Sequence, residues 1–443
     1  MKLIEHVKGL IGNPLAKATS GTAGLKLAFT GLLFVTSLVL ARYLGVAGYG
    51  VFAYAIAWLN LLTVFALLGL DKLLVREVSV YKEQGQWRAL RGILQWAPLV
   101  VLSMSMVLGA IIVIAAWVFA SGESNTVSIS LSVIMLALPL AALGRVRQAI
   151  MQGLNHIVIG QLPENIIQPA AFLILVIVLW TLFGSESANA LVVLGMYIAA
   201  IIVAFLIGGI QLYKRIPGPV KVVSPVYFNN EWLRSAMPML LVGGMNIINA
   251  RIDTIFLGAI KGVEAAGIYV VAARGAELIL FVMVAVNTTV APTFAHLYAT
   301  NKLERLQKVV SNSARIMLLA ATPVAAALIL FGGWFLGLFG PEFIVGQPAL
   351  TILCVGQLIN VAMGSPGVLL VMTGNERQAA IGVGVCTALN LILNSILIPV
   401  WGVAGAATAT AISIASSNVL LAFLVHSRIG IHSTAATSLI RRI

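Results

Sequence analysis

The chain has 443 residues, of which 60% are hydrophobic and only 9% are charged, with a formal net charge of +13. Soluble domains carry about a quarter charged residues, so this composition excludes a soluble globular protein. The apolar residues run unbroken for about twenty positions, unlike the alternating ten-residue segments of barrel strands. Only helices and closed barrels satisfy their backbone in lipid, so we expect an all-α integral membrane protein.

Twelve apolar stretches fill most of the chain and predict about twelve transmembrane helices. They cover residues 19–41, 50–70, 93–120, 128–144, 163–183, 190–213, 235–258, 267–291, 313–333, 346–373, 378–400 and 404–426. With this topology, 23 of the 27 Lys and Arg residues lie on the side of the two termini, including Arg147 in the loop after the fourth span. By the positive-inside rule both termini face the cytoplasm. This asymmetry explains the positive charge without nucleic-acid binding.

Three features of the first half carry charge near the membrane. Lys26 lies just inside the first span, where its ammonium group either reaches the inner surface or adds positive charge at the inner mouth of a cavity. Residues 71–91 form a basic, amphipathic segment that we expect to lie along the cytoplasmic membrane face. Glu164 follows Pro163 at the start of the fifth span, and either suits the helix N-terminus or neutralises charge inside a cavity.

An internal repeat relates the two halves. An offset of 217 residues aligns Gly45–Phe52 with Gly262–Tyr269 and brings Tyr81 onto Tyr298. Each half then holds six spans, and because six is even, the halves would be parallel repeats about an axis along the membrane normal. The segment Asn301–Arg315 would be the second surface segment, equivalent to residues 71–91.

The repeat divides the chain into two lobes. We expect an N-terminal lobe of residues 1–213, a cytoplasmic linker of residues 214–234, and a C-terminal lobe of residues 235–443 that ends in a short cytoplasmic tail. The linker contains three prolines, which fix φ and remove donors, so it should be non-helical in part.

Four charges fall in the seventh and eighth spans: Arg251, Asp253, Arg274 and Glu277. A charged side chain inside the bilayer costs several kcal/mol unless it is paired or wetted, so this hairpin predicts a polar site. The turn centred near residue 262 places both arginines about 10 Å from the outer helix ends. Asp253 with Arg274, and Arg251 with Glu277, are the expected pairs across the hairpin.

Two interpretations of these charges remain open. In one, they form a structural ion-pair cluster that locks the hairpin. In the other, they form a switchable site, because arginine presents a planar fork of donors that grips phosphate. A carboxylate there is also a candidate for binding a coupling proton or sodium ion. We expect no other cofactor and no resident metal, because the chain has no P-loop motif and its five histidines lack metal-ligand spacing.

Several asparagines fall within the spans, and we expect most of them to bond between helices. They are Asn60, Asn246, Asn249, Asn287, Asn360, Asn390 and Asn394.

The turn between the first two spans, Ala41–Gly50, reads A-R-x-L-G-x-x-x-Y-G. With Pro163-Glu164-Asn165 and Arg251-x-Asp253, it resembles Wzx-like polysaccharide flippases, the O-antigen transporters of the multidrug/oligosaccharidyl-lipid/polysaccharide (MOP) exporter superfamily. The resemblance implies a MATE-like fold of two six-helix lobes around a central cationic cavity. It also implies transport, by alternating access, of undecaprenyl-pyrophosphate-linked oligosaccharide to the outer leaflet of the bacterial inner membrane, for O-antigen or other lipopolysaccharide biosynthesis.

The resemblance also implies roles for particular residues. Related lipid II flippases carry functional arginines in the first span, but here Phe29–Ser37 is uncharged. That departure favours Arg251 and Arg274, with Lys26, as the residues that bind the pyrophosphate. The charge-neutralising or coupling-ion residues would be Asp253, Glu277 and Glu164. The implied partners are the lipid-linked oligosaccharide, membrane lipids and a polysaccharide polymerase complex.

Two other classes compete with the flippase. A cation-coupled exporter of drugs or metabolites would share the fold. A membrane glycosyltransferase, polymerase or ligase would need catalytic side chains in aqueous loops, but the longest outer loop, Trp334–Val345, has Glu342 as its only ionisable group. We therefore expect a protein that is not an enzyme. A purely structural assembly protein would leave the buried charges unexplained.

Overall fold

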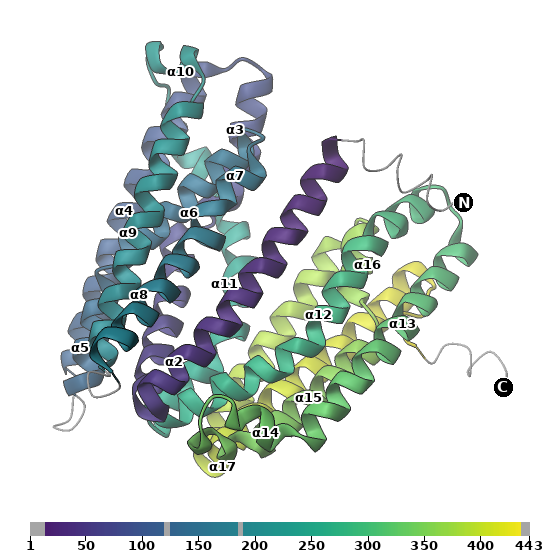
Figure 1. Ribbon diagram of the computed structural model, residues 1–443. Helices are drawn as coiled ribbons and strands as arrows, with labels where there is room; N and C mark the ends of the chain where they lie inside the picture. The colour runs from purple at the N-terminus through teal and green to yellow at the C-terminus, as the bar shows by residue number, and fades with distance from the viewer. Residues whose placement is uncertain (1–13, 119–124, 185–188, 436–443) are drawn as a thin grey trace. The chain divides into compact units, whose positions relative to one another are not determined.

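The computed structural model describes residues 14–118, 125–184 and 189–435, and within these ranges the side chains from Ala28 onward except that of Asn125. The described part is helical throughout and contains no strand (Figure 1). In unbroken chain order its elements are α2 (Pro14–Leu67), α3 (Leu70–Glu83), α4 (Trp87–Val118), α5 (Asn125–Met135), α6 (Leu138–Gly153), α7 (Ile157–Leu162), a π-helical turn η1 (Pro163–Ile167), α8 (Gln168–Phe183), α9 (Ala190–Arg215), α10 (Gly218–Val222), α11 (Asn229–Ile260), α12 (Val263–Ala299), α13 (Leu303–Leu330), α14 (Gly332–Gly337), a 3-10 turn η3 (Pro341–Gly346), α15 (Gln347–Ala362), α16 (Pro366–Met372) and α17 (Glu376–Ile429).

The helices confirm an all-α membrane protein that crosses the bilayer several times. Within the described residues, ten helical stretches are long and apolar enough to span a membrane. Two helices, α2 and α17, have 54 residues each and are interrupted by non-helical angles at Gly45 and Gly402. A straight helix of that length would reach about 80 Å, far more than a bilayer requires. Each therefore holds enough helix for two spans, and the total of twelve stays a prediction.

The glycines at the helix reversals follow the internal repeat. Gly45 (φ 65°, ψ −176°) and Gly262 (φ 90°, ψ 163°) are aligned by the 217-residue offset and have nearly the same backbone conformation. Only glycine enters this region readily, because it has no Cβ. Gly184 (φ 68°, ψ −172°) and Gly402 (φ 54°, ψ −124°) form a second pair, 218 residues apart. The same kind of turn therefore recurs in both halves of the sequence.

The chain changes direction at the single residue Gly45, whereas the sequence predicts a loop over residues 42–49. Residues 42–49 are helical apart from the glycine, so the second segment of α2 begins at once. Its exposed backbone N–H groups need an acceptor, and the Oε2 of Glu342 accepts from the N of Val46 at 3.2 Å. The ring of Phe343 packs edge-on against Tyr49 beside this contact. Glu342 thus caps a helix 296 positions away in the sequence.

The chain divides into two compact units. In the described part, unit 1 consists of residues 14–44 and Trp58–Gly244, and unit 2 consists of Gly45–Ala57 and residues 245–435.

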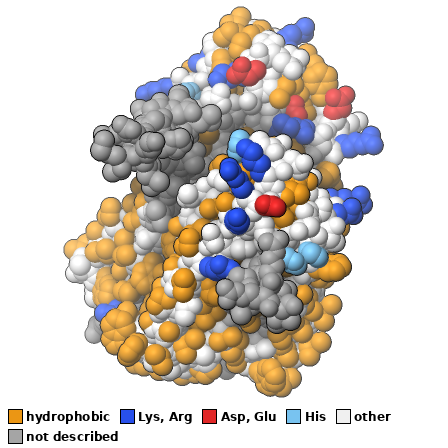
Figure 2. Space-filling model, turned by 90° about the vertical axis from the view of Figure 1, so that its right-hand side faces the viewer, with side chains coloured by type: hydrophobic (Ala, Val, Ile, Leu, Met, Phe, Trp, Pro, Cys, Tyr) orange, Lys and Arg blue, Asp and Glu red, His pale blue; other side chains and the backbone are white. Residues whose placement is uncertain are grey.

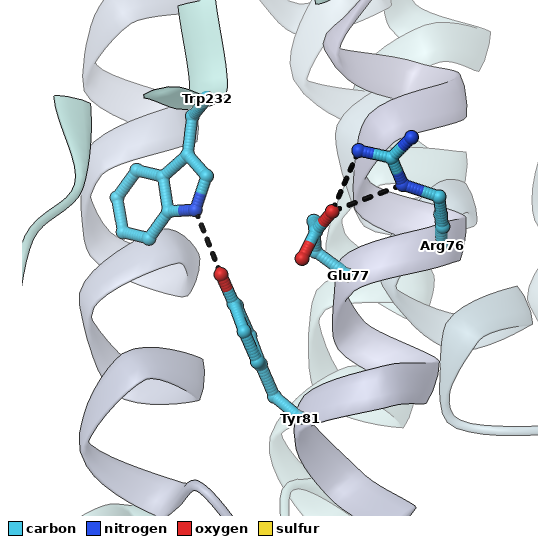
Figure 3. Close-up of polar contacts among 4 residues, drawn as sticks. All are labelled: Arg76, Glu77, Tyr81 and Trp232. Atoms are coloured by element: carbon cyan, nitrogen blue, oxygen red, sulfur yellow. Dashed lines mark hydrogen bonds and ion pairs between the residues drawn. The ribbon is translucent and has the colours of Figure 1, made fainter. Parts of the chain in front are cut away.

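The core of unit 1 joins α3, α4 and α6 to the first turns of α11. Trp232, which is 2% exposed, packs against Trp96 and donates from Nε1 to the hydroxyl of Tyr81 at 3.0 Å (Figure 3). On the same helix as Tyr81, the Oε1 of Glu77 accepts from the Nε and a terminal nitrogen of Arg76, at 2.9 and 2.8 Å. The two contacts of Trp232 hold the start of α11 against α3 and α4.

Unit 2 contains most of the remaining helices. Its described chain end packs back onto α13, because the side-chain amide of Gln307 bonds both the N and the O of His432, at 2.8 Å each. Asn301–Arg315 is not a separate surface segment but leads into α13 and forms its first turns. The turn at Asn301 (φ 54°) separates α12 from α13, as Gly85 (φ 65°) separates α3 from α4. On the face drawn in Figure 2, charged side chains gather in the upper part and hydrophobic ones cover most of the lower part.

Candidate functional site

A buried carboxylate surrounded by neutral donors marks unit 2. Asp253 of α11 is 4% exposed. Its Oδ2 accepts from the hydroxyls of Tyr269 and Thr410, at 2.7 Å each. Its Oδ1 accepts from the Nδ2 of Asn394 at 2.6 Å and of Asn390 at 3.3 Å. Four hydrogen bonds offset much of the cost of burying the charge, but none of these four partners carries a positive charge.

The helix reversals bring these groups to one depth. Asn394 and Thr410 lie eight residues on either side of Gly402, so the two segments of α17 present them at the same distance from the turn. Asp253 and Tyr269 lie nine and seven residues from Gly262 in the same way. At 1.5 Å per residue, all four side chains sit about 10–14 Å from the helix ends. We call Asp253, Tyr269, Asn390, Asn394 and Thr410 the Asp253 pocket.

The Asp253 pocket has spare acceptors. The Oδ1 atoms of Asn390 and Asn394 are buried and have no hydrogen-bond partner. The same is true of the Oδ1 of Asn249, which lies one turn from Asp253 on α11. The Nδ2 of Asn249 donates to the hydroxyl of Thr387 at 2.9 Å. A half-rotation of an asparagine amide exchanges its nitrogen for its oxygen. Carboxylate, hydroxyl and amide oxygens are ligands for a hard cation, and a carboxylate can equally take up a proton.

The asparagines confirm one expectation from the sequence. Asn249, Asn390 and Asn394 each bond between helices, as predicted for amides within the spans.

Arg274 and Glu277 pair with one another rather than across the hairpin as expected. Arg274 donates to the Oε2 of Glu277 of its own helix at 2.9 Å, and their side chains are 19% and 48% exposed. Residues three apart share a helix face, so this pair forms without the partner helix. The Nε of Arg274 is buried without a hydrogen-bond partner. The four hydrogen bonds of Asp253 come from the neutral groups of its pocket and not from Arg274.

Arg251 is half-buried two residues before Asp253. Two residues turn a helix by about 200°, so these two side chains leave α11 in nearly opposite directions. Lys26, the third residue predicted to bind pyrophosphate, lies in α2, and its side chain is outside the described residues.

Unit 1 contains an ion pair that the sequence reading missed. Arg147 of α6 and Glu164 of η1 bond to one another, and their side chains are 4% and 12% exposed. A terminal nitrogen of Arg147 also donates to the carbonyl of Gly160 at 3.1 Å. The placement of Arg147 in a cytoplasmic loop is therefore wrong: α6 continues to Gly153 and buries it.

Glu164 lies at a helix start, as expected, and it also forms an ion pair with Arg147. Glycines on the neighbouring helices make room for the pair. A Cβ on Gly208 of α9 would lie 2.4 Å from the guanidinium carbon of Arg147, and one on Gly144 would lie 3.1 Å from Glu164. The signal that could have located Arg147 is the apolar run Ala149-Ile150-Met151 after it, which continues the buried face of α6.

Comparisons with known proteins agree with this architecture. The family model described as "Polysaccharide biosynthesis protein" matches residues 15–298, and the MatE model matches residues 238–396. Two relatives from Haloferax volcanii, "Probable flippase AglR" and "Probable low-salt glycan biosynthesis flippase Agl15", are each 30% identical, over 179 and 183 residues. These alignments cover 38% and 40% of this chain but only 36% and 38% of the relatives.

Solved structures show the same fold at low identity. A multidrug resistance MATE family transporter in an inward-facing conformation has a TM-score of 0.70 and 15% identity, covering 92% of this chain and 98% of its own. The lipid II flippase MurJ has a TM-score of 0.69 and 17% identity, covering 92% of this chain and 87% of its own. The fold is thus that of the MOP superfamily, and because the polysaccharide biosynthesis model spans well over half of the residues, the chain belongs to that family.

Proposed function

We propose that this protein is a transporter, not an enzyme, that moves a lipid-linked oligosaccharide from one leaflet of the membrane to the other. Family membership supports this proposal. So do the names of the two relatives from Haloferax volcanii, of which one is a probable flippase and the other a probable low-salt glycan biosynthesis flippase.

The Asp253 pocket is the observation that carries the energetic part of the proposal. A carboxylate inside a membrane span, bonded by neutral groups from α12 and from both segments of α17, is suited to binding and releasing a small cation. With sodium bound, the amide oxygens of Asn390 and Asn394 would turn toward the ion. A ligand stabilises whichever state gathers its donors, so cation binding would favour one conformation of the transporter.

The arginines are proposed to recognise the substrate. The lipid carrier would be undecaprenyl pyrophosphate, and Arg251 and Arg274, with Lys26, would contact its pyrophosphate. Glu277 holds the guanidinium of Arg274 at 2.9 Å and would release it to the stronger charge of a pyrophosphate. The setting would be a bacterial inner membrane, with both termini in the cytoplasm and a polysaccharide polymerase complex receiving the flipped glycan. O-antigen is one glycan that this chemistry would allow.

A reconstituted assay tests the proposal. The purified full chain would be placed in liposomes with a fluorescent lipid-linked oligosaccharide, and appearance of the headgroup outside would be measured with and without a sodium or proton gradient. We expect transport by the native chain to be stimulated by one gradient. Asp253→Asn should lose that stimulation, whereas Glu264→Gln, an exposed acid of the same hairpin, should keep it. Full stimulation of Asp253→Asn would refute cation coupling at this pocket.

A cation-coupled exporter of drugs or metabolites is the second candidate. The MatE model matches residues 238–396, which include Asp253, Tyr269, Asn390 and Asn394. The same liposomes loaded with a cationic dye distinguish the two candidates. Gradient-driven dye movement without movement of the lipid-linked oligosaccharide would favour the exporter.

A further inference from the structure

The segment between α9 and α11, residues 216–228, is held against α4 of unit 1 by several hydrogen bonds, and we call it the connector. The carbonyl of Lys221 accepts from Arg91 at 3.1 Å, and the hydroxyl of Ser224 accepts from Arg88 at 3.0 Å. The N of Val226 donates to the carbonyl of Arg88 at 3.0 Å. Two guanidinium groups of α4 thus hold the backbone of the connector.

The connector also passes directly over α4. A Cβ on Gly92 would lie 1.9 Å from the carbonyl oxygen of Val226, so this approach requires a glycine. The hydroxyl of Tyr227 donates to the Oε1 of Gln95 at 2.9 Å. The outward face of the connector is therefore presented by a fixed backbone.

That outward face combines positive charge with exposed apolar surface. We define the connector surface as Tyr213, Lys214, Lys221 and Val222. Val222 is 86% exposed and Tyr213 is 69% exposed, and both lysines are exposed. The Nζ of Lys221 lies 4.4 Å from the centre of the Tyr213 ring. Throughout residues 190–228 there are three basic residues and no acidic one.

The position of Tyr213 identifies what covers this surface. Leu206, Ile210 and Tyr213 are 58%, 57% and 69% exposed, and their spacing of four and three places them on one face of α9. The first two belong to the apolar part of a candidate membrane span, so we expect this face to contact lipid tails. Tyr213 and the cations beside it then lie one turn further, at the depth of the lipid headgroups. Aromatic and basic side chains are enriched there.

We propose that the connector surface binds the headgroup of an anionic phospholipid, with Lys214 and Lys221 contacting the phosphate and Val222 reaching into the adjoining lipid. Each feature has a part in this site: the lysines supply charge, and Tyr213 and Val222 supply the apolar contact of an interfacial anchor. Acids of neighbouring elements, Glu83 at the end of α3 and Glu231 in the first turn of α11, lie outside the basic run. The proposal does not depend on the substrate that the protein transports.

Titration of the detergent-purified full chain tests this site. The probes are dioctanoyl phosphatidylglycerol, dioctanoyl phosphatidylcholine and inorganic phosphate. We expect phosphatidylglycerol to bind more tightly than either of the other two. The double variant Lys214→Gln/Lys221→Gln should weaken that binding about tenfold or more, because each lysine near anionic lipid contributes separately.

A matched control shows whether the lipid binds at the connector surface. Lys302→Gln/Lys308→Gln removes the same charge from two exposed lysines in unit 2 and should leave the affinity nearly unchanged. Val222→Ser should also weaken binding, because it removes the apolar contact. Equal losses in the two double variants would overturn the proposal, and so would phosphate binding as tight as that of phosphatidylglycerol. All substituted side chains are exposed, and thermal unfolding midpoints would verify that the variants fold.

Discussion

Gly50 of α2 and Gly267 of α12 lie against one another. A Cβ on Gly267 would be 2.9 Å from the Cα of Gly50, and a Cβ on Gly50 would be 2.1 Å from the carbonyl oxygen of Val263. The 217-residue offset of the internal repeat aligns the same two glycines. The two helices therefore touch where both equivalent residues lack a side chain, a close approach that small residues allow between membrane helices.

Gly50→Ala should destabilise the protein by about 1–3 kcal/mol, because the new methyl group overlaps a backbone carbonyl that cannot rotate away. Gly31→Ala on the same helix is the matched control, since a Cβ there has no neighbour within 4 Å. Thermal unfolding in detergent, followed by loss of monodisperse protein, measures both. An equal midpoint for the two variants would contradict the contact.

Arg147→Met should destabilise the protein by about 3–5 kcal/mol, because it leaves the Glu164 carboxylate buried without its cation. Arg145→Met, two residues away and exposed, should have little effect. In the double variant Arg147→Met/Glu164→Gln, much of the lost stability should return, since no unpaired charge remains. The same unfolding assay reports all three. A double variant as unstable as Arg147→Met would show that the pair is not the source of the loss.

The sequence predicts helix type and position better than side-chain partners. Spans could be located because apolar runs of the required length are a local property, and the repeat could be found because it preserves Gly45 and Gly262. Partners depend on the rotation of each helix about its axis. The sequence predicts Arg274 as the partner of Asp253, yet the carboxylate accepts from Asn394 and Thr410, which lie 141 and 157 residues away. No local pattern specifies that choice.

Arg147 shows a second limit. Counting basic residues by side of the membrane assigns every arginine near a span end to a loop, but Arg145 and Arg147 both lie within α6, where Arg145 is exposed. Arg147 follows two residues later but points into the unit. Its burial depends on Gly208 of α9 and on the π-helical turn that carries Glu164, neither of which is near it in the sequence. A buried ion pair of this kind requires knowledge of the packing.

Acidification should reveal the environment of His156, which lies between two candidate spans. Burial lowers the pKa of this imidazole below its usual 6.5, and the nearby charges of Arg215 and Lys82 lower it further. The unfolded chain therefore binds the proton more readily. Stability contributed by the neutral ring is complete above about pH 6.5 and decreases as the pH falls below it. His156→Gln should flatten this part of the curve of unfolding midpoint against pH. Identical curves for the native chain and for His156→Gln would contradict the assignment.

Thr387→Val should weaken the response of transport to the coupling cation without abolishing transport. Thr387 accepts from Asn249 at 2.9 Å. Asn249 lies one turn from Asp253 on α11, and Thr387 lies one turn from Asn390 on α17. If the cation approaches from that side, Asn249 and Thr387 would replace some of its water molecules before it reaches the carboxylate. Valine has the shape of threonine but lacks the hydroxyl that would take part in this step. We expect the sodium or proton concentration for half-maximal transport to rise about three- to tenfold, corresponding to one lost hydrogen bond. Thr408→Val is the control, because that hydroxyl donates to the Ala404 carbonyl of its own helix at 2.8 Å. If the maximal rate falls while the half-maximal concentration stays constant, Thr387 contributes to structure and not to the path of the cation.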